Sequence, residues 1–352
     1  MLKNNKIFKT SDLQKLDKYT IENEPVTSLG LMERAATVFT EKLLIFFPNS
    51  HIFNILAGSG NNGGDGYVVA RLLYQNGLNV KVFGLHENDH LSPNCAVNRE
   101  RFINMGGCYI EVKNPDNLQP DENSVLVDAI FGAGLNRPVT GFLGDIIRRI
   151  NGLSHPVVAI DMPSGLMGED NGENNGAIIK ADYTFTFQFP KLAFMFPENV
   201  VYFGHWEVLD IRLHPIILRE YPATYYYLTE EVVTSRLLIP AKFSHKGTLG
   251  NTLLIVGSYS MMGAAVLAAK GAIRSGTGLL SVHVPRKLKE MIHLSVPEAL
   301  VEVDRNEFCF SGVDNLSRFQ AVGIGSGIGT SPVTAEGIRQ LLSVWRGKIV
   351  LD

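Results

Sequence analysis

Short apolar runs alternate with amphipathic segments through the first part of the chain. The runs are rich in β-branched residues and almost continuously apolar, as expected of strands that are covered on both faces of a parallel sheet. They predict strands at residues 52–57, 80–84, 108–112, 125–130, 157–160 and 183–187. Between them, apolar residues at helical spacing predict helices at residues 67–76, 93–105 and 141–150. This alternation is typical of a three-layer, Rossmann-like, doubly wound α/β domain, which binds ligands at the carboxyl ends of its strands.

Two further helices are predicted ahead of the first strand. Ser11 is followed three residues later by Gln14, which is the spacing of a capping box, so a helix is expected to start at this point. A second helix is expected at residues 28–39, where apolar residues again recur at helical spacing.

A second α/β unit begins after an irregular segment. Between residues 212 and 243 the alternation lapses, and prolines interrupt any period. Strands are then expected at residues 253–258, 279–284 and 321–324, with an alanine-rich helix at 264–275 and a later helix that Ser331 and Pro332 would start. The sequence therefore predicts two domains, at residues 1–212 and 241–352, joined by a linker at 213–240.

The composition fits a globular protein of two domains. The 352 residues are 45% hydrophobic and 19% charged, with a net charge of −3 at pH 7. This charge gives no general electrostatic basis for binding nucleic acid or an anionic membrane, so neither partner is expected. No apolar segment approaches the roughly 20 residues that span a bilayer, and no signal-peptide core follows Met1, so we expect a cytoplasmic protein. The three cysteines form no CxxC pair, which favours neither a disulfide framework nor a thiolate metal site.

The glycine-rich stretch 58–66 is the most informative segment of the chain. It contains five glycines in nine residues and lies between a predicted strand and a predicted helix. Backbone amides attract anions at such a helix start, and glycine lets a ligand approach the main chain closely. A Walker A loop is disfavoured, because Gly64 and Asp65 stand where that motif needs a lysine and a hydroxyl residue.

Two other interpretations of this stretch stay open on the pattern alone. The dinucleotide fingerprint Gly-x-Gly-x-x-Gly fits Gly58, Gly60 and Gly63, although Asp65 would then place a carboxylate near the pyrophosphate. Alternatively, Asn61, Asn62 and Asp65 are themselves ligands for sugar hydroxyls, a carboxamide or a hard cation.

Two more strand ends carry polar residues. Asp128 lies in one predicted strand, which runs into a second glycine-containing loop, and the next strand runs into Asp161 and Ser164. A single aspartate at a strand end is more often a turn or cap residue, because its side chain bonds to nearby backbone amides. Polar residues at three strand ends of one sheet are harder to explain as separate turn residues, so we expect them to converge on one cleft.

The motifs of these three strand ends together resemble the NAD(P)H-hydrate epimerase family. They are Asn61-Asn62-Gly63-Gly64-Asp65-Gly66, residues 128–137 and Asp161-Met162-Pro163-Ser164-Gly165, and the resemblance spans about residues 10–211. The following motifs at residues 245–250, 256–258, 263–265 and 325–329 are similar to the start of the ADP-dependent NAD(P)H-hydrate dehydratase, a ribokinase-like domain. The two domains are fused in this order in many bacteria. Their substrate is a nicotinamide cofactor to which water has added across the 5,6 double bond.

The resemblance implies that the first domain interconverts the R and S forms of hydrated NADH or NADPH at C6. It implies a K⁺ ion held by Asn62, Asp128 and Ser164. It further implies that the substrate is bound by Asn61, Asn62, Gly63, Gly64, Asp65, Gly132, Ala133, Gly134, Leu135, Asn136, Arg137, Pro138 and Asp161. Asp161 is the candidate proton-transfer group, because a carboxylate can stabilise the cationic or carbonyl character that develops at C6. Lys191, just beyond a strand end, is a further candidate for the cleft.

For the second domain, the resemblance implies that ADP phosphorylates the C6 hydroxyl and that phosphate then leaves, giving AMP and the repaired cofactor. ADP and Mg²⁺ are the expected cofactors, and Ala264 and Gly327 are expected on the substrate side. The sequence ends at Asp352, before the segment Gly-Thr-Gly-Asp that carries the family's catalytic aspartate. We therefore expect this domain to be truncated rather than a complete or remnant dehydratase.

Two alternatives come from other functional classes. One is a dinucleotide-dependent oxidoreductase that uses the glycine fingerprint, and the other is an epimerase-like binding module without dehydratase activity. The aspartates at positions 128 and 161 argue against a module with no catalytic role. The expected partner is a small-molecule substrate, and a homo-oligomer formed through the N-terminal helices is expected.

Overall fold

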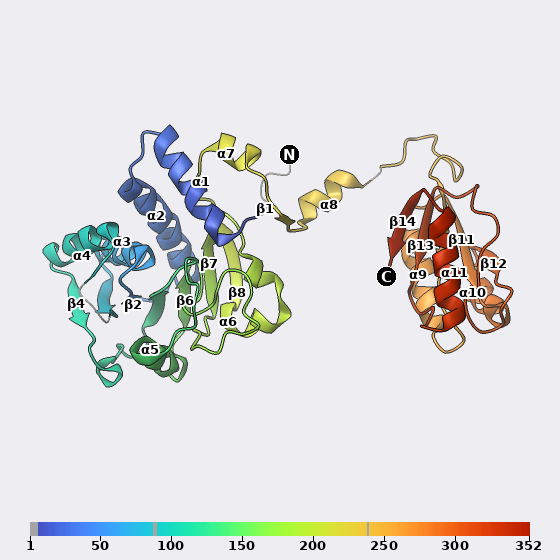
Figure 1. Cartoon of the computed structure of the whole chain (residues 1–352). Coiled ribbons are helices and arrows are strands. Elements are labelled where there is room, and N and C mark those ends of the chain that lie inside the picture. The colour runs from blue at the N-terminus through green and yellow to red at the C-terminus, as the bar shows by residue number, and fades with distance from the viewer. Residues whose placement is uncertain (1–5, 87–89, 238) are drawn as a thin grey trace. The chain divides into compact units, whose positions relative to one another are not determined.

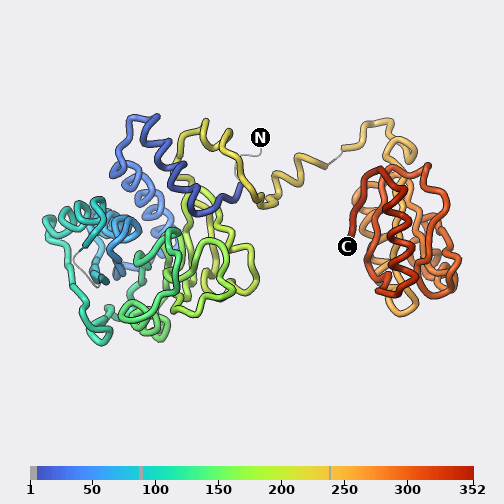
Figure 2. Tube along the Cα trace, in the orientation of Figure 1, coloured from blue at the N-terminus to red at the C-terminus, as the bar shows by residue number. Residues whose placement is uncertain are grey.

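The computed structural model describes residues 6–86, 90–237 and 239–352 (Figures 1 and 2). The chain divides into two compact units, Met1–Ser235 and Arg236–Asp352. Each unit has a parallel sheet with helices packed on both faces, so the predicted α/β class is confirmed for both.

The first unit is built on a seven-stranded parallel sheet with the order β4-β3-β2-β5-β6-β7-β8. Its strands are β2 (Ile52–Ala57), β3 (Asn79–Gly84), β4 (Cys108–Glu111), β5 (Val125–Ala129), β6 (Val157–Ile160), β7 (Tyr183–Phe187) and β8 (His205–Leu209). The six predicted strands are confirmed to within one residue at each end. The sequence pattern does not predict β8, because this edge strand mixes polar and apolar residues.

Helices cover both faces of this sheet and give it three layers. They are α2 (Ser28–Phe46), α3 (Asn61–Gln75), α4 (Pro93–Asn104) and α5 (Gly141–Asn151). On one face, α2, α3 and α4 pack on the strands through side chains such as Phe39 and Tyr67. On the other face, α5 buries Ile146 and Ile150 against the same sheet. The expected three-layer arrangement is therefore confirmed.

The first helix, α1 (Thr10–Asn23), starts without the predicted capping box. Its N-cap is Lys9, which makes no side-chain cap hydrogen bond. The backbone amide of Thr10 instead donates to Glu169 Oε1 at 2.6 Å. A side chain distant in sequence thus accepts a hydrogen bond from a free amide of the first helical turn, where a local capping residue was expected to do so.

The segment assigned above to a linker contains regular structure. It holds α7 (Pro215–Glu220), β9 (Tyr225–Tyr226) and α8 (Glu230–Arg236). Helix α7 contacts α1, and β9 pairs antiparallel with β1 (Lys6–Ile7), so much of this segment packs on the first unit. The domain limits at residues 212 and 241 stay a prediction.

The second unit has a five-stranded parallel sheet with the order β12-β11-β10-β13-β14. Its elements are β10 (Asn251–Ile255), α9 (Met262–Arg274), β11 (Leu279–Val284), α10 (Lys289–Ser295), β12 (Leu300–Val303), β13 (Ala321–Ile324), α11 (Pro332–Val344) and β14 (Lys348–Leu351). Helices α9 and α10 cover one face of the sheet and α11 covers the other. The predicted start of α11 is confirmed, since the Ser331 side chain accepts a hydrogen bond from the amide of Thr334.

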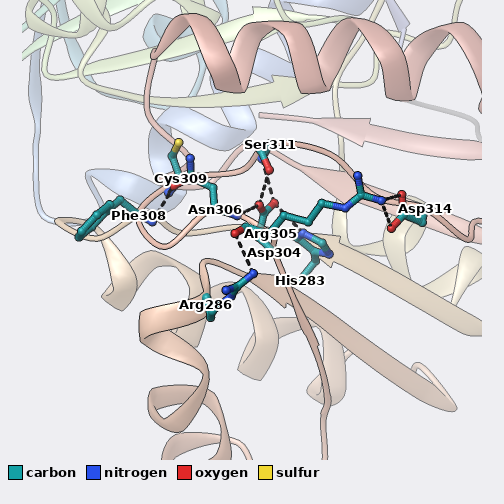
Figure 3. Close-up of polar contacts among 9 residues, drawn as sticks. All are labelled: His283, Arg286, Asp304, Arg305, Asn306, Phe308, Cys309, Ser311 and Asp314. Atoms are coloured by element: carbon teal, nitrogen blue, oxygen red, sulfur yellow. Dashed lines mark hydrogen bonds and ion pairs between the residues drawn. The ribbon is translucent and has the colours of Figure 1, made fainter.

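A buried polar network holds the loop that follows β12 (Figure 3). The Asp304 carboxylate lies 2.8 Å from His283 Nε2 and accepts hydrogen bonds from the amides of Asn306 and Ser311 at 2.7 and 2.8 Å. Burial alone would raise the pKa of Asp304, but these bonds and that of the Ser311 hydroxyl lower it to about 2. The carboxylate therefore connects the loop to β11, because it contacts His283 of that strand as well as the loop amides.

Shorter elements complete the two units. They are α6 (Val200–Phe203) and the 3₁₀ helices Pro115–Asn117, Leu192–Met195, Pro197–Asn199 and Arg286–Leu288. Throughout the described ranges, no helix combines the length and the apolar character needed to cross a membrane.

Candidate functional site

The glycine-rich stretch forms the start of a helix rather than a loop. Helix α3 begins at Asn61 with Gly60 as its N-cap, well before the expected start at residue 67. A Cβ on Gly63 would lie 2.0 Å from the carbonyl oxygen of Gly58, and one on Gly66 would lie 2.6 Å from Cβ of Ala129. The glycines therefore let α3 pack closely on the end of β2 and on β5, which local sequence patterns cannot reveal.

A pocket of about 560 Å³ lies where the strand order reverses, between β2 and β5. Such a reversal separates the loops that follow the two strands and opens a crevice between them. The predicted residues that line the pocket are Asn61, Asn62, Asp65, Gly132, Ala133, Gly134, Leu135, Asn136, Arg137 and Asp161. Lys191 also lines it, whereas Gly63, Gly64, Pro138, Asp128 and Ser164 do not. A second hollow, of about 710 Å³, lies along α2, α3 and α4 and contains none of the predicted site residues.

Two of the three candidate cation ligands, Asp128 and Ser164, are hydrogen-bonded to each other. Asp128 is fully buried, and its carboxylate accepts hydrogen bonds from the Ser164 amide at 2.7 Å and the Ser164 hydroxyl at 2.5 Å. Ser164 Oγ in turn accepts a bond from the amide of Phe131 at 2.8 Å. Burial raises the pKa of Asp128 to about 6, while the bonds from Ser164 and the Ile130 amide oppose that rise.

Asn62 supplies an oxygen that fits a hard cation. Its Nδ2 donates to the carbonyl of Ile160 at 2.9 Å, which fixes the orientation of the amide. The residue is only 8% exposed, and its Oδ1 is buried and has no hydrogen-bond partner among the described residues. A buried acceptor without a partner is costly, and oxygens of an amide, a carboxylate and a hydroxyl are the kinds of ligand that suit K⁺.

Asp161 is held by a buried lysine. Its Oδ1 accepts hydrogen bonds from Lys191 Nζ at 2.6 Å, from the Phe187 amide at 3.0 Å and from Thr186 Oγ1 at 3.1 Å. The side chain of Lys191 is 2% exposed and that of Asp161 is 15% exposed. Asp161 also has a positive φ of 68°, a conformation that aspartate tolerates better than most residues. The arrangement presents a fixed carboxylate to the pocket.

Asp17, which was not among the predicted site residues, lines the same pocket from α1. Burial raises the pKa of Asp17 to about 6, and the Asp161 carboxylate adds to that rise. Burial also raises the pKa of Asp65 well above its usual range, with further contributions from Asp161 and Asp17. Helical spacing is the sequence pattern that could have indicated Asp17. One face of α1 lines the pocket, and it carries Thr10, Leu13, Gln14, Asp17 and Ile21.

In the second unit, the structure brings the two predicted residues together. A Cβ on Gly327 would lie 2.9 Å from the Cβ of Ala264, and Gly327 has a positive φ of 76°. Gly327 closely follows β13, and Ala264 lies in the first turn of α9, the helix that follows β10. The strand order of the second sheet reverses between β10 and β13. The amide of Gly257 donates to the carbonyl of Ser326 at 2.9 Å and joins the two loops.

Comparison with known proteins gives the same division of the chain. One family model, described as the YjeF-related protein N-terminus, matches residues 28–193, and another, described as NAD(P)H-hydrate dehydratase, matches residues 252–352. The bifunctional NAD(P)H-hydrate repair enzyme Nnr of Moorella thermoacetica is 31% identical over 97% of this chain and 67% of its own length. The Synechocystis protein of the same name is 33% identical over 92% of this chain and 62% of its own length.

A shorter relative matches the first unit. The NAD(P)H-hydrate epimerase of Weissella koreensis is 39% identical over 58% of this chain and 90% of its own length. The chain thus spans about two thirds of the bifunctional relatives, from 62% to 67% in the two compared above, and nearly all of the epimerase. The resemblance inferred from the motifs is confirmed, and the chain belongs to the family of bifunctional NAD(P)H-hydrate repair enzymes.

Proposed function

We propose that the first unit epimerises hydrated NADH and NADPH at C6 of the nicotinamide ring. The observation that supports this most directly is that the ends of β2, β5 and β6 meet around one pocket. Its volume of about 560 Å³ lies in the range of small-molecule sites. The Weissella koreensis relative, which covers the same unit and is named as an epimerase, supports the same reaction.

In this proposal Asp161 moves a proton at the C6 hydroxyl. Its carboxylate lines the pocket, and Lys191 Nζ holds it in place through the contact at 2.6 Å. Asn61, Asp65 and residues 132–137 would bind the rest of the dinucleotide, with Arg137 as a cation for its phosphates.

K⁺ would be held by Asn62, Asp128 and Ser164. When bound, it would supply a fixed positive charge at the junction of the β2, β5 and β6 ends. The unpartnered Oδ1 of Asn62 supports this assignment. Asp128 and Ser164 lie outside the pocket lining, and Ser164 also accepts a hydrogen bond from the Phe131 amide.

For the second unit, we propose a part in the ADP-dependent dehydration of the S form to NAD(P)H. Ala264 and Gly327 would contact the substrate, and ADP with Mg²⁺ would supply the phosphoryl group. The matching family model, described as NAD(P)H-hydrate dehydratase, supports this assignment. Because the substrate is a damaged intracellular cofactor, we place the protein in the cytoplasm. A homo-oligomer stays a prediction.

The test is an assay with separated R and S forms of hydrated NADH, with and without ADP. We expect wild-type chain to interconvert the two forms without ADP. Asp161→Asn should slow this interconversion by about 10²-fold or more, with the circular dichroism spectrum of the folded protein retained. Near-normal turnover of Asp161→Asn would remove that residue from the mechanism, and no interconversion by the wild-type chain would refute the proposed function.

A further inference from the structure

Three carboxyl groups line the pocket from different elements. Asp17 comes from α1, Asp65 from the N-terminal part of α3, and Asp161 from the end of β6. Of these three carboxyl groups, only that of Asp161 forms an ion pair among the described residues, and its partner is Lys191. The three groups therefore differ in the charge that surrounds them, which is the usual origin of separate acid and base roles in one site.

The position of Asp17 is fixed by the packing of its helix. The neighbouring Leu16 is fully buried, and Thr20 Oγ1 accepts a hydrogen bond from the amide of His214 at 3.1 Å. Thr10, at the helix start, is bonded to Glu169 through both its amide and its hydroxyl. A carboxyl group on a helix anchored at three points is held in a constant position in the pocket.

Burial favours the protonated form of Asp17. The titratable and charged groups that line the same pocket are Asp65, Asp161, Lys191 and Arg137. Lys191 is already paired with Asp161, so the net influence of that pair on a neighbouring carboxyl group is small compared with burial. The pKa of about 6 keeps Asp17 able both to donate and to regain a proton near neutral pH, whereas burial raises the pKa of Asp65 further.

Epimerisation by ring opening needs an acid as well as a base. The base takes the proton of the C6 hydroxyl, the C6–N1 bond breaks with its electron pair going to N1, and the acid protonates N1. The products are an aldehyde at C6 and an enamine nitrogen. After rotation about the C5–C6 bond, N1 attacks the other face of the aldehyde, returns its proton to the acid, and the oxygen regains the proton held by the base.

We propose that Asp17 is this acid and acts opposite Asp161 as the base. The inference rests on the proposed epimerase function. Asp17 and Asp161 line one pocket from two different elements, α1 and the end of β6, and the substrate ring would lie between them. Asp65, in this arrangement, binds the substrate.

The test compares Asp17→Asn with Glu22→Gln, a matched change from carboxyl to amide at an exposed position of the same helix. We expect Asp17→Asn to lower kcat for interconversion of the hydrated NADH epimers by about 10²-fold or more, with little change in KM. Glu22→Gln should match the wild type. In the wild type kcat/KM should fall as the pH rises above about 6, and this limb should be absent in Asp17→Asn.

Interconversion by Asp17→Asn at the wild-type rate, with the same pH profile, would overturn the inference and leave the epimerase function intact. If the wild-type chain itself fails to interconvert the epimers, the proposed function is what fails. Should Asp17→Asn not fold, a ¹³C NMR titration of aspartate-labelled wild-type chain decides. A carboxyl resonance assigned to Asp17 that titrates near 6 supports the inference, and titration near the ordinary value of 3.8 overturns it.

Discussion

The ammonium group of Lys191 and the carboxylate of Asp161 form an ion pair of 2.6 Å in which the lysine side chain is only 2% exposed. Lys191 Nζ also donates to Thr186 Oγ1 at 2.8 Å. The lysine charge thus has partners on β7 and at the end of β6, and it is directed at the candidate catalytic carboxylate.

Removing this lysine should damage both stability and activity. Lys191→Met keeps most of the side-chain volume but leaves Asp161 without its cation, and loss of one partner of a buried pair costs about 3–5 kcal/mol. We therefore expect the first unit to unfold at a lower urea concentration, and we expect epimerisation to be lost. The double variant Lys191→Met with Asp161→Asn should regain part of the stability and none of the activity. A double variant no more stable than Lys191→Met would show that the two residues are not energetically coupled.

Asn62→Ala should weaken K⁺ binding more than substrate binding. The substitution removes the unpartnered Oδ1, so the KCl concentration needed for half-maximal activity should rise by about tenfold or more, equivalent to about 1.4 kcal/mol. Stabilisation of the protein by KCl, relative to choline chloride in thermal unfolding, should shrink in parallel. Asn61→Ala is the control, since Asn61 lines the pocket and is not among the proposed ligands. Equal KCl requirements in the two variants would exclude Asn62 as a ligand.

Glycines of α3 should differ sharply in their tolerance of alanine. Gly63→Ala would bring a Cβ to 2.0 Å from the Gly58 carbonyl, a backbone atom that cannot move aside, and should destabilise the first unit by about 1–3 kcal/mol or more. Gly60→Ala meets nothing within 4 Å and should cost less than about 1 kcal/mol. Chemical unfolding followed by circular dichroism measures both. Equal losses would contradict the idea that close packing requires glycine at position 63, since helix propensity alone would favour alanine there.

The sheet and most of the site are predictable from sequence because buried parallel strands produce continuous apolar runs. Polar residues placed at the ends of those runs, such as Asp161, necessarily meet at one edge of the sheet. Asp17 is not predictable in this way, since its role depends on how α1 folds over the pocket. The start of α3 is missed for a similar reason, because glycines disfavour a helix locally and are required here by tertiary packing.

The buried network at Asp304 should make the second unit sensitive to acid. The pKa of Asp304 is lowered from its ordinary 3.8 to about 2 in the folded state, so the stabilisation from its ionised form is present above pH 3.8 and lost as the pH falls towards 2. The loss should be on the order of 2 kcal/mol. Hydrogen exchange of the β11 amides, corrected for intrinsic rates, should report this loss of stability between pH 5 and pH 2.5 in the wild type. The loss should be much smaller in Asp304→Asn. Asp314→Asn, which changes an exposed carboxylate in the same loop region, should behave as the wild type. The same acid dependence in Asp304→Asn and the wild type would show that the loop at residues 304–311 is held by contacts other than this carboxylate.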